Sequence, residues 1–141
     1  MGSFSKQKGK RGEREAVNLL KPTIEKVYSE SDMDAPVLFR NQNQSANGGY
    51  DIDGLSWLAL EVKRCEVLSI AKWWEQTNRQ ASGNQAPVLL YRQNGKKWRV
   101  RMWGYLQAGD RRVKAPVDIE IETFLVWFEV RLKAELVDTI V

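Results

Sequence analysis

The chain contains no histidine and only one cysteine among its 141 residues. Without histidine there is no Ser-His-Asp or Cys-His catalysis, no imidazole general base and no histidine-ligated zinc or iron. A single cysteine excludes an internal disulfide and a multi-cysteine zinc cluster, and it fits a reducing compartment. Any metal must therefore be held by carboxylates, carbonyl oxygens and water, the ligands that suit Mg²⁺, Mn²⁺ or Ca²⁺.

Long apolar runs are also missing from the sequence. No run approaches the roughly 18 residues that a membrane-spanning helix needs, and no signal peptide precedes the first polar stretch. We therefore expect a soluble, cytoplasmic protein with no membrane partner. The length fits one domain that folds without disulfides or metal; we expect a basic, flexible arm at 1–10 and a single domain at 11–141.

The positive charge is modest in amount but uneven in placement. The formal net charge is +4, from 22 Lys and Arg against 18 Asp and Glu. Residues 6–14 are rich in Lys and Arg, and residues 92–114 carry eight basic side chains against the single acid Asp110. Trp and Tyr are interleaved with this second cluster. Such a pattern indicates a polyanionic partner; the alternative is a solvated basic surface.

The hydrophobic pattern predicts a mixed α/β domain. A helix begins at Gly12, where apolar residues recur every three or four positions, and Pro22 is expected to end or kink it. The remaining elements are expected as strands at 36–40, 50–53 and 57–64, a helix at 69–81, strands at 86–92 and 97–102, and a helix at 119–136. Asn94-Gly95 predicts the hairpin between the last two strands, and a polar, basic loop follows them. This order favours one central sheet flanked by helices.

The stretch from Asp51 to Lys63 carries the most chemical information. Glu61 and Lys63 lie two apart on a predicted strand and so point to the same face. A tight turn at 53–54 would leave Asp51 opposite Ser56, about 17 Å short of Glu61 at the strand rise. For the two carboxylates to meet, the bend must instead cover residues 54–57. We predict that bend, and with it a shared cation site.

These residues resemble a known family motif. Asp51, Glu61 and Lys63 are similar to the PD-(D/E)xK nuclease motif, with Tyr50 where a proline often stands. Three further segments match in order the Holliday-junction-resolvase-like nucleases of phages and archaea: Gly-Glu-Arg-Glu in the first helix, Trp-Trp-Glu-Gln at 73–76, and the hairpin around 86–100. The resemblance covers roughly residues 9–103. It implies a restriction-endonuclease-like αβββαβ core, with an additional C-terminal helix.

The resemblance also implies roles for the matching residues. Asp51 and Glu61, with the Val62 carbonyl, would bind Mg²⁺ or Mn²⁺, and Lys63 would orient or activate the attacking water. A metal lowers the pKa of bound water, which replaces the missing histidine. Asp53 faces the same side as Asp51 and competes with it for the catalytic role.

Two helical residues and a set of basic side chains complete the expected site. Glu13 would support a metal position from the first helix, and Gln76 would orient Lys63 or a phosphate. The DNA backbone would be held by Lys8, Lys10, Arg11, Arg40, Arg64, Lys97, Arg99 and Arg101. These roles imply branched DNA as partner, a homodimer because symmetric cuts need two related sites, and the host cytoplasm if a phage encodes the chain.

Each assignment has a simpler alternative. Glu61 and Lys63 could form a surface salt bridge, and Asp53 could serve only the turn. Glu13 could stabilise the N-terminus of its helix, while Gln76 could be solvated. Two other functions compete with cleavage of branched DNA: a repair or restriction-type nuclease on linear DNA, and a DNA-binding module without catalysis.

Overall fold

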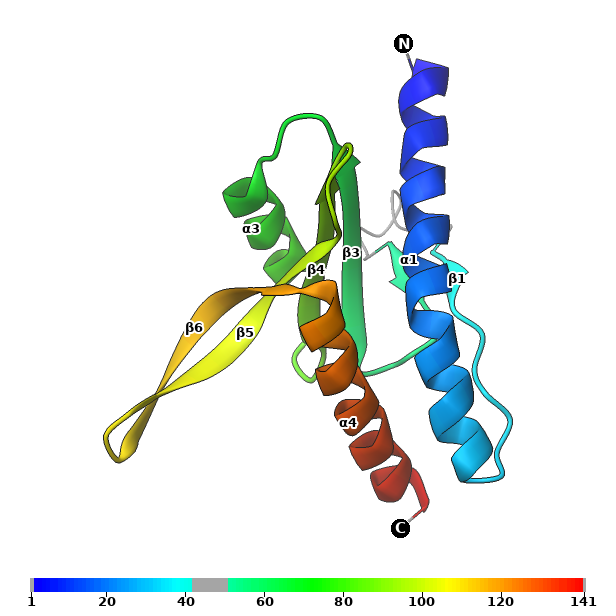
Figure 1. The fold of residues 1–141 in the computed structure, drawn as a ribbon, viewed down its shortest axis with the longest axis vertical. Helices are drawn as coiled ribbons and strands as arrows, with labels where there is room; N and C mark the ends of the chain where they lie inside the picture. Colours follow the sequence, from blue (N-terminus) through cyan, green and yellow to red (C-terminus); the bar gives the residue numbers. More distant parts are fainter. Residues whose placement is uncertain (1, 42–50, 141) are drawn as a thin grey trace.

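The computed structural model describes the backbone of residues 2–41 and 51–140, and side chains within 11–41 and 51–138. These residues form one sheet and three helices (Figure 1). The elements are α1 (Gly2–Glu30), β1 (Phe39–Arg40), β2 (Ile52–Asp53), β3 (Leu58–Cys65), α3 (Ile70–Gln80), β4 (Ala86–Gln93), β5 (Arg99–Ala108), β6 (Arg111–Glu120) and α4 (Ile121–Ile140).

The strands of the described sheet lie side by side in chain order, from β1 to β6. Only β3 and β4 are parallel, with Leu58 opposite Ala86, and α3 forms the crossover between them. The other neighbouring pairs are antiparallel. The mixed α/β class expected from the sequence is therefore confirmed, and the element order αβββαβ holds as far as β4.

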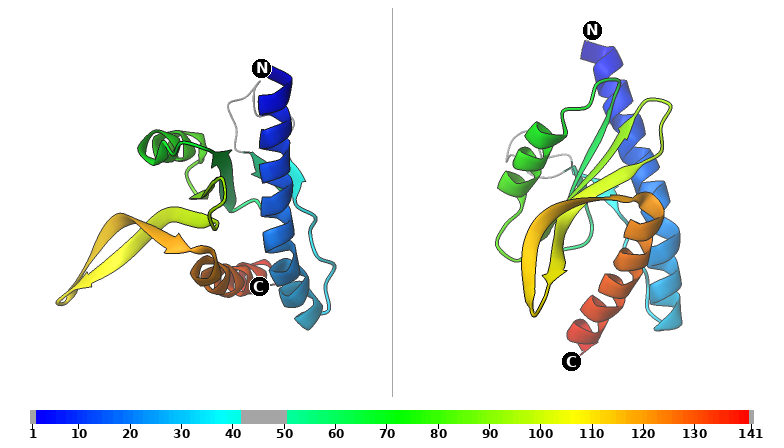
Figure 2. Two further views of the ribbon diagram at one scale, coloured as in Figure 1. Left: turned by 45° about the horizontal axis from the view of Figure 1, so that its top comes forward. Right: turned by 60° about the vertical axis from the view of Figure 1, so that its left-hand side comes forward.

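Helices cover both faces of the sheet (Figure 2). Apolar side chains of α1 and α4 pack on one face against Leu60, Val88 and their neighbours, and this cluster forms the main core. On the other face, α3 packs Trp73 and Trp74 against Leu89 and Tyr91. Both tryptophans are buried, with Trp74 edge-on to Trp103, so neither is left for an exposed surface.

Helix α1 is longer than the sequence indicates. It begins at Gly2 rather than Gly12, so the segment expected as an arm is helical from residue 2 onward. Pro22 lies inside the helix and does not end it. Because Pro22 is exposed and the helix buries Leu20 and Ile24 on its inner side, packing of that apolar face outweighs the lost backbone hydrogen bond.

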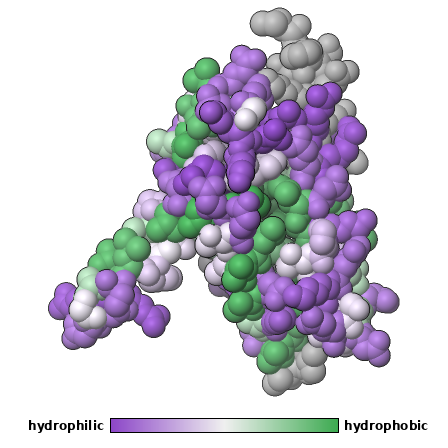
Figure 3. Space-filling view, viewed as in Figure 1, coloured by the Kyte–Doolittle hydropathy of each residue, from purple (hydrophilic) through white to green (hydrophobic). Residues whose placement is uncertain are grey.

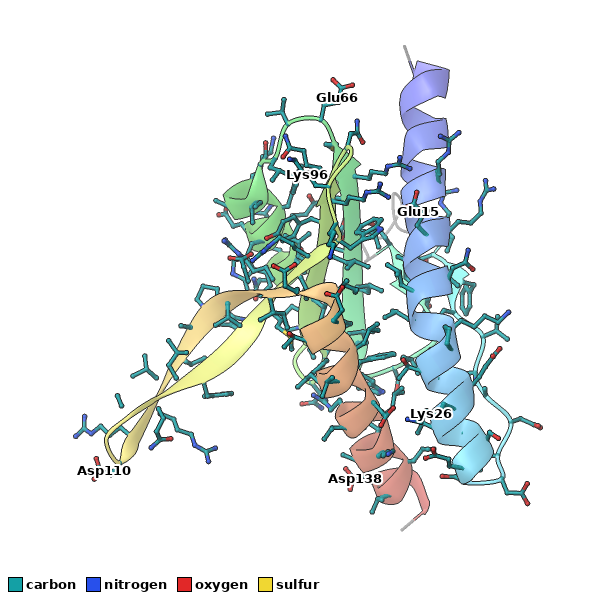
Figure 4. The ribbon with its side chains drawn as sticks, viewed as in Figure 1. Glu15, Lys26, Glu66, Lys96, Asp110 and Asp138 are labelled. Atoms are coloured by element: carbon teal, nitrogen blue, oxygen red, sulfur yellow. The ribbon has the colours of Figure 1, made fainter. Side chains whose placement is uncertain are left out.

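The loop expected after residue 102 is instead a hairpin, which corrects the prediction. Strands β5 and β6 pair antiparallel from Arg99–Glu120 to Ala108–Arg111, and the hairpin projects from the body with Asp110 at its tip (Figure 4). Gly109, at φ 63°, supplies the turn conformation. Pro116 lies in β6, the edge of the described sheet, where a missing backbone donor is tolerated.

The other elements lie close to their expected positions. β3, α3, β4 and α4 match the predicted segments within one to four residues at each end, whereas β1 and β2 are shorter than expected. Ser69 precedes α3 but makes no side-chain capping hydrogen bond. Tyr50 and the polar loop at 42–49 lie outside the described residues. None of the described helices is long and apolar enough to cross a membrane.

Candidate active site

The bend between β2 and β3 has the predicted geometry. Ile52 pairs with Leu60, which sets Asp51 directly opposite Glu61. The Asp51 amide donates to the Leu60 carbonyl at 3.0 Å, and the turn covers residues 54–57. Gly54 adopts φ 129° and donates its amide to Asp53 Oδ1 at 2.7 Å. Asp53 therefore serves the turn, and Asp51 is the aspartate that meets Glu61.

The two carboxylates are buried together. Relative exposure is 7% for Asp51 and 2% for Glu61. Burial, followed by the charge of Asp51, raises the pKa of Glu61 to about 8, and burial also raises the pKa of Asp51. Asp51 Oδ2 accepts a hydrogen bond from the Val62 amide at 2.8 Å. Glu61 Oε2 has no hydrogen-bond partner within the described residues, so the pair leaves buried acceptor capacity unused.

Lys63 supplies a positive charge beside this pair. Its Nζ lies 3.7 Å from Glu61 Oε1, and the side chain is 27% exposed. Because Glu61 is almost fully buried, the contact is not the surface salt bridge considered above. Desolvation exceeds the effect of Lys63 on Glu61, whose pKa stays raised. One lysine therefore does not balance the buried carboxyl groups.

Glu13 reaches the same region from α1. Its side chain is 9% exposed, and it forms an ion pair with Arg40. Burial, followed by the charge of Asp51, raises the pKa of Glu13. Glu13 lies eleven residues from the start of α1, so a role at the helix N-terminus is wrong. Across the sheet edge, the helix thus adds a third acid to the electrostatic environment of Asp51.

Gly12 allows α1 to approach β3 closely enough for this arrangement. A Cβ atom at position 12 would lie 3.3 Å from Arg64 Cβ and 3.9 Å from Val62 Cγ1. The first distance is shorter than an ordinary van der Waals contact, so a larger residue would push the helix from the strand. The glycine of the family-like segment therefore has a packing role here.

Gln76 lies on α3, half-buried. Trp74 and Asn78 face the β5 side of this helix, where the Trp103 indole donates to Asn78 Oδ1 at 2.9 Å. At 100° per residue, Gln76 lies on the other side of Trp73 from Trp74 and Asn78. The described residues show no hydrogen bond between Gln76 and Lys63, and the expected contact with Lys63 stays a prediction.

Most of the arginines expected to hold DNA are paired with acids. Arg40 binds Glu13, Arg64 binds Glu15, Arg99 binds Glu120 and Arg101 binds Asp118. The acids at 118 and 120 come from β6, the strand that the sequence pattern failed to predict. The charges of Arg99 and Arg101 are therefore partly balanced by these acids, and their contact with DNA stays a prediction. Arg11 and Lys97 are exposed, and the side chains of Lys8 and Lys10 lie outside the described residues.

Glu15 is a structural centre that sequence reasoning missed. Its carboxylate accepts from Arg64 at 2.6 Å, Arg92 at 2.9 Å and the Trp98 indole at 3.1 Å. These partners come from β3, β4 and the turn before β5, and Glu15 lies on the side of α1 that faces the strands (Figure 4). Only the tertiary fold joins these distant residues, and no local spacing in the sequence indicated the cluster.

The donor set at Asp51 and Glu61 consists of hard oxygen atoms. The N–H and C=O groups of one strand residue point to the same side of the strand. Because the Val62 amide donates to Asp51, the Val62 carbonyl points to the Asp51 side of β3 as well. Two carboxylates, this carbonyl and water suit Mg²⁺ or Mn²⁺. Among the described residues, no group of three or more Asp, Glu, Cys or His side chains is arranged to hold a metal ion. Glu13 therefore does not join Asp51 and Glu61 as a third acidic ligand, and any cation here would rest on the two carboxylates, the Val62 carbonyl and water.

Comparison of the chain with protein-family models, with curated proteins and with solved structures found no match.

Proposed function

We propose that this protein is a Mg²⁺- or Mn²⁺-dependent DNA endonuclease of the restriction-endonuclease-like fold, acting on branched DNA. The observation that carries the proposal is the buried pair of Asp51, just before β2, and Glu61 on β3, with Lys63 beside it. Burying two acids against one lysine costs folding free energy. A cation would offset that cost, which favours a functional site over a structural ion pair.

The proposed roles follow from these positions. Asp51, Glu61 and the Val62 carbonyl would hold the cation, which when bound polarises the phosphate and acidifies water. The Lys63 ammonium, on the same strand face, would orient the attacking water and balance charge on the phosphate oxygens. Hydrolysis adds water across the P–O3′ bond and leaves a 5′-phosphate and a 3′-hydroxyl. Glu13 and Arg40 would brace the edge at which the DNA backbone arrives.

The test compares three labelled DNA substrates in Mg²⁺: a four-way junction, a linear duplex and a single strand. We expect wild type to cut the junction, and Glu61→Gln and Lys63→Ala to bind it without cutting. Glu25→Gln and Lys21→Ala are matched controls because both side chains are exposed on α1. We also expect binding without cleavage in Ca²⁺ and steep weakening with salt.

Each alternative function has its own outcome in this experiment. Equal cleavage of linear and branched DNA would favour a repair or restriction-type nuclease. Binding without cleavage in Mg²⁺ and Mn²⁺ would favour a non-catalytic module. Cleavage by Glu61→Gln at the wild-type rate would contradict the site assignment itself.

We further propose that the enzyme is a homodimer, with the projecting hairpin of one copy against α4 of the other. Tyr105 and Leu106 on the hairpin and Val126 and Val130 on α4 are more than half exposed, and Figure 3 shows apolar surface along both elements. Arg111 and Arg112 are exposed near the hairpin tip, and Asp138 is exposed near the C-terminal end of α4, so opposite charges are available to the two surfaces. Light scattering tests this: Val130→Asp should yield a monomer, and a wild-type monomer at high concentration would contradict it.

A further inference from the structure

The edge strand β1 presents two exposed apolar side chains. Phe39 is 53% exposed and Val37 is 78% exposed, whereas Leu38 between them is buried at 7%. This alternation is that of an extended chain, so Val37 and Phe39 point away from the core that receives Leu38. The backbone of this segment is fixed in place, because Gly54 lies against the Val37 carbonyl and the Leu38 Cα.

The strand register sets Phe39 on the same face as the carboxylates. Phe39 pairs with Asp53, and Ile52 pairs with Leu60, so Phe39, Asp51 and Glu61 share one face of the sheet. From the strand spacing and rise, the Cα atoms of Phe39 and Asp51 are about 8 Å apart. That distance is roughly two nucleotide steps at 3.4 Å per step.

Among the described residues, α3 packs mainly on β3 and β4, and Phe39 stays more than half exposed. Arg40 follows Phe39 on the opposite side of β1, with its side chain 44% exposed beside Glu13. An exposed aromatic ring therefore lies on the same sheet face as the carboxylate pair, about two nucleotide steps away, and Arg40 lies on the other side of the same strand. An aromatic ring stacks on any nucleobase, whereas a base paired within a duplex offers no free face to it.

We propose that Phe39 is a stacking platform for one unpaired nucleobase close to the phosphate held at Asp51 and Glu61. The inference rests on the proposed nuclease function and deepens it, because it makes an unstacked nucleotide the feature that selects the substrate. Nucleotides at a junction or a flap can leave the stack at low cost, whereas those of an intact duplex cannot. Val37 extends the apolar edge beside the ring.

The test uses junctions that carry 2-aminopurine, a fluorescent adenine analogue, at single positions around the cut, with Ca²⁺ to permit binding without cleavage. Stacking on an aromatic ring quenches this base. We expect quenching at one position on binding to wild type and to Phe39→Trp, and none with Phe39→Ala. The Kd of Phe39→Ala should rise about 5- to 100-fold. Met33→Ala, an exposed residue beyond the far end of α1, should bind as wild type does.

The outcomes separate this proposal from the nuclease function. Cleavage with no quenched position, and wild-type affinity in Phe39→Ala, would overturn the platform and leave the nuclease standing. Quenching that depends on Phe39 without cleavage in Mg²⁺ or Mn²⁺ would support the platform and overturn the nuclease. Absence of binding to every DNA tested would overturn both. Circular dichroism melting shows whether Phe39→Ala is folded. If Phe39→Ala is unfolded, the quenching experiment is carried out with wild type and Phe39→Trp.

Discussion

Asp51, the residue before β2, lies beside Glu61 of β3, because Ile52 pairs with Leu60, and Asp51 also accepts a hydrogen bond from the Val62 amide at 2.8 Å. The carboxylates are thus fixed by backbone pairing rather than by flexible side chains. Because the register depends on a bend over residues 54–57, the pair and the bend form one structural unit.

Replacing Glu61 by glutamine should stabilise the metal-free protein at alkaline pH. Burial, and then the charge of Asp51, raise the pKa of Glu61 from 4.5 to about 8 in the folded state. The folded state therefore retains a proton that the unfolded state has released, so stability falls as pH rises from 4.5 to 8. We expect Glu61→Gln to remove this loss, with a gain in unfolding free energy at pH 9 and little change at pH 4. Urea denaturation in EDTA measures both.

The control for this prediction is Glu25→Gln, whose side chain is 59% exposed and should show no such pH dependence. Adding Mg²⁺ should raise the melting temperature of wild type and leave that of Glu61→Gln unchanged, because a ligand of the folded state stabilises it. If Glu61→Gln changed the unfolding free energy by the same amount at pH 4 and pH 9, the pKa of Glu61 would not be raised in the folded state, which would contradict the prediction.

Replacing Glu15 by alanine should lower the unfolding free energy by about 2–4 kcal/mol, since it removes three hydrogen bonds and leaves two partly buried guanidinium groups without their carboxylate. Glu75→Ala is the matched control: its pair with Arg79 spans 3.7 Å and both side chains are about 70% exposed, so it should cost under about 0.5 kcal/mol. Equal losses in the two variants, measured by urea denaturation, would contradict a central role for Glu15.

Gly54→Ala should destabilise the protein by about 2 kcal/mol or more. Gly54 adopts φ 129°, and an added Cβ would lie 2.8 Å from the Val37 carbonyl oxygen, so the substitution combines backbone strain with a clash. Gly83→Ala should have little effect because nothing lies within 4 Å of its added Cβ. Thermal melting compares the two. A Gly54→Ala variant as stable as wild type would show that the bend does not fix the register.

Asp118→Asn should destabilise the protein at neutral pH but not in acid. Burial raises the pKa of Asp118, but the hydrogen bonds from Arg101 and Tyr91 lower it by more than burial raises it. The pKa of Asp118 in the folded state therefore lies below the ordinary value of 3.8. A depressed carboxyl pKa contributes stability above the unfolded value that disappears as pH falls below it. We expect a loss of about 1–2 kcal/mol at pH 7, shrinking below pH 3.8. Asp110→Asn, at the hairpin tip, is the control; a loss that persists at pH 2 would contradict the assignment.

The sequence predicted the elements whose signals are local. Extended apolar runs marked β3 and β4, and alternation at 97–102 marked the start of β5. The spacing of Phe124, Phe128 and Leu132 marked α4, and the distance between Asp51 and Glu61 required the observed bend. The hairpin β5–β6 carried a readable signal too, in Gly109 and the alternation from Val113 to Ile119, which the prediction of a polar, basic loop overlooked. Pro116 lies within this alternation. Proline excludes a central strand and not an edge one.

The sequence by itself determined that any catalysis here must proceed without histidine, and that Asp51, Glu61 and Lys63 can share one face of a mixed sheet. Those conclusions rest on composition and on the two-residue period of a strand, which are local properties. Only the tertiary structure decided that Glu120 and Asp118 neutralise Arg99 and Arg101, that Glu15 joins Arg64 to Arg92, and that Phe39 is exposed on the carboxylate face. These contacts join residues that are separated in the chain. They form only when the sheet and helices have packed, because burial and close pairing of the side chains stabilise them.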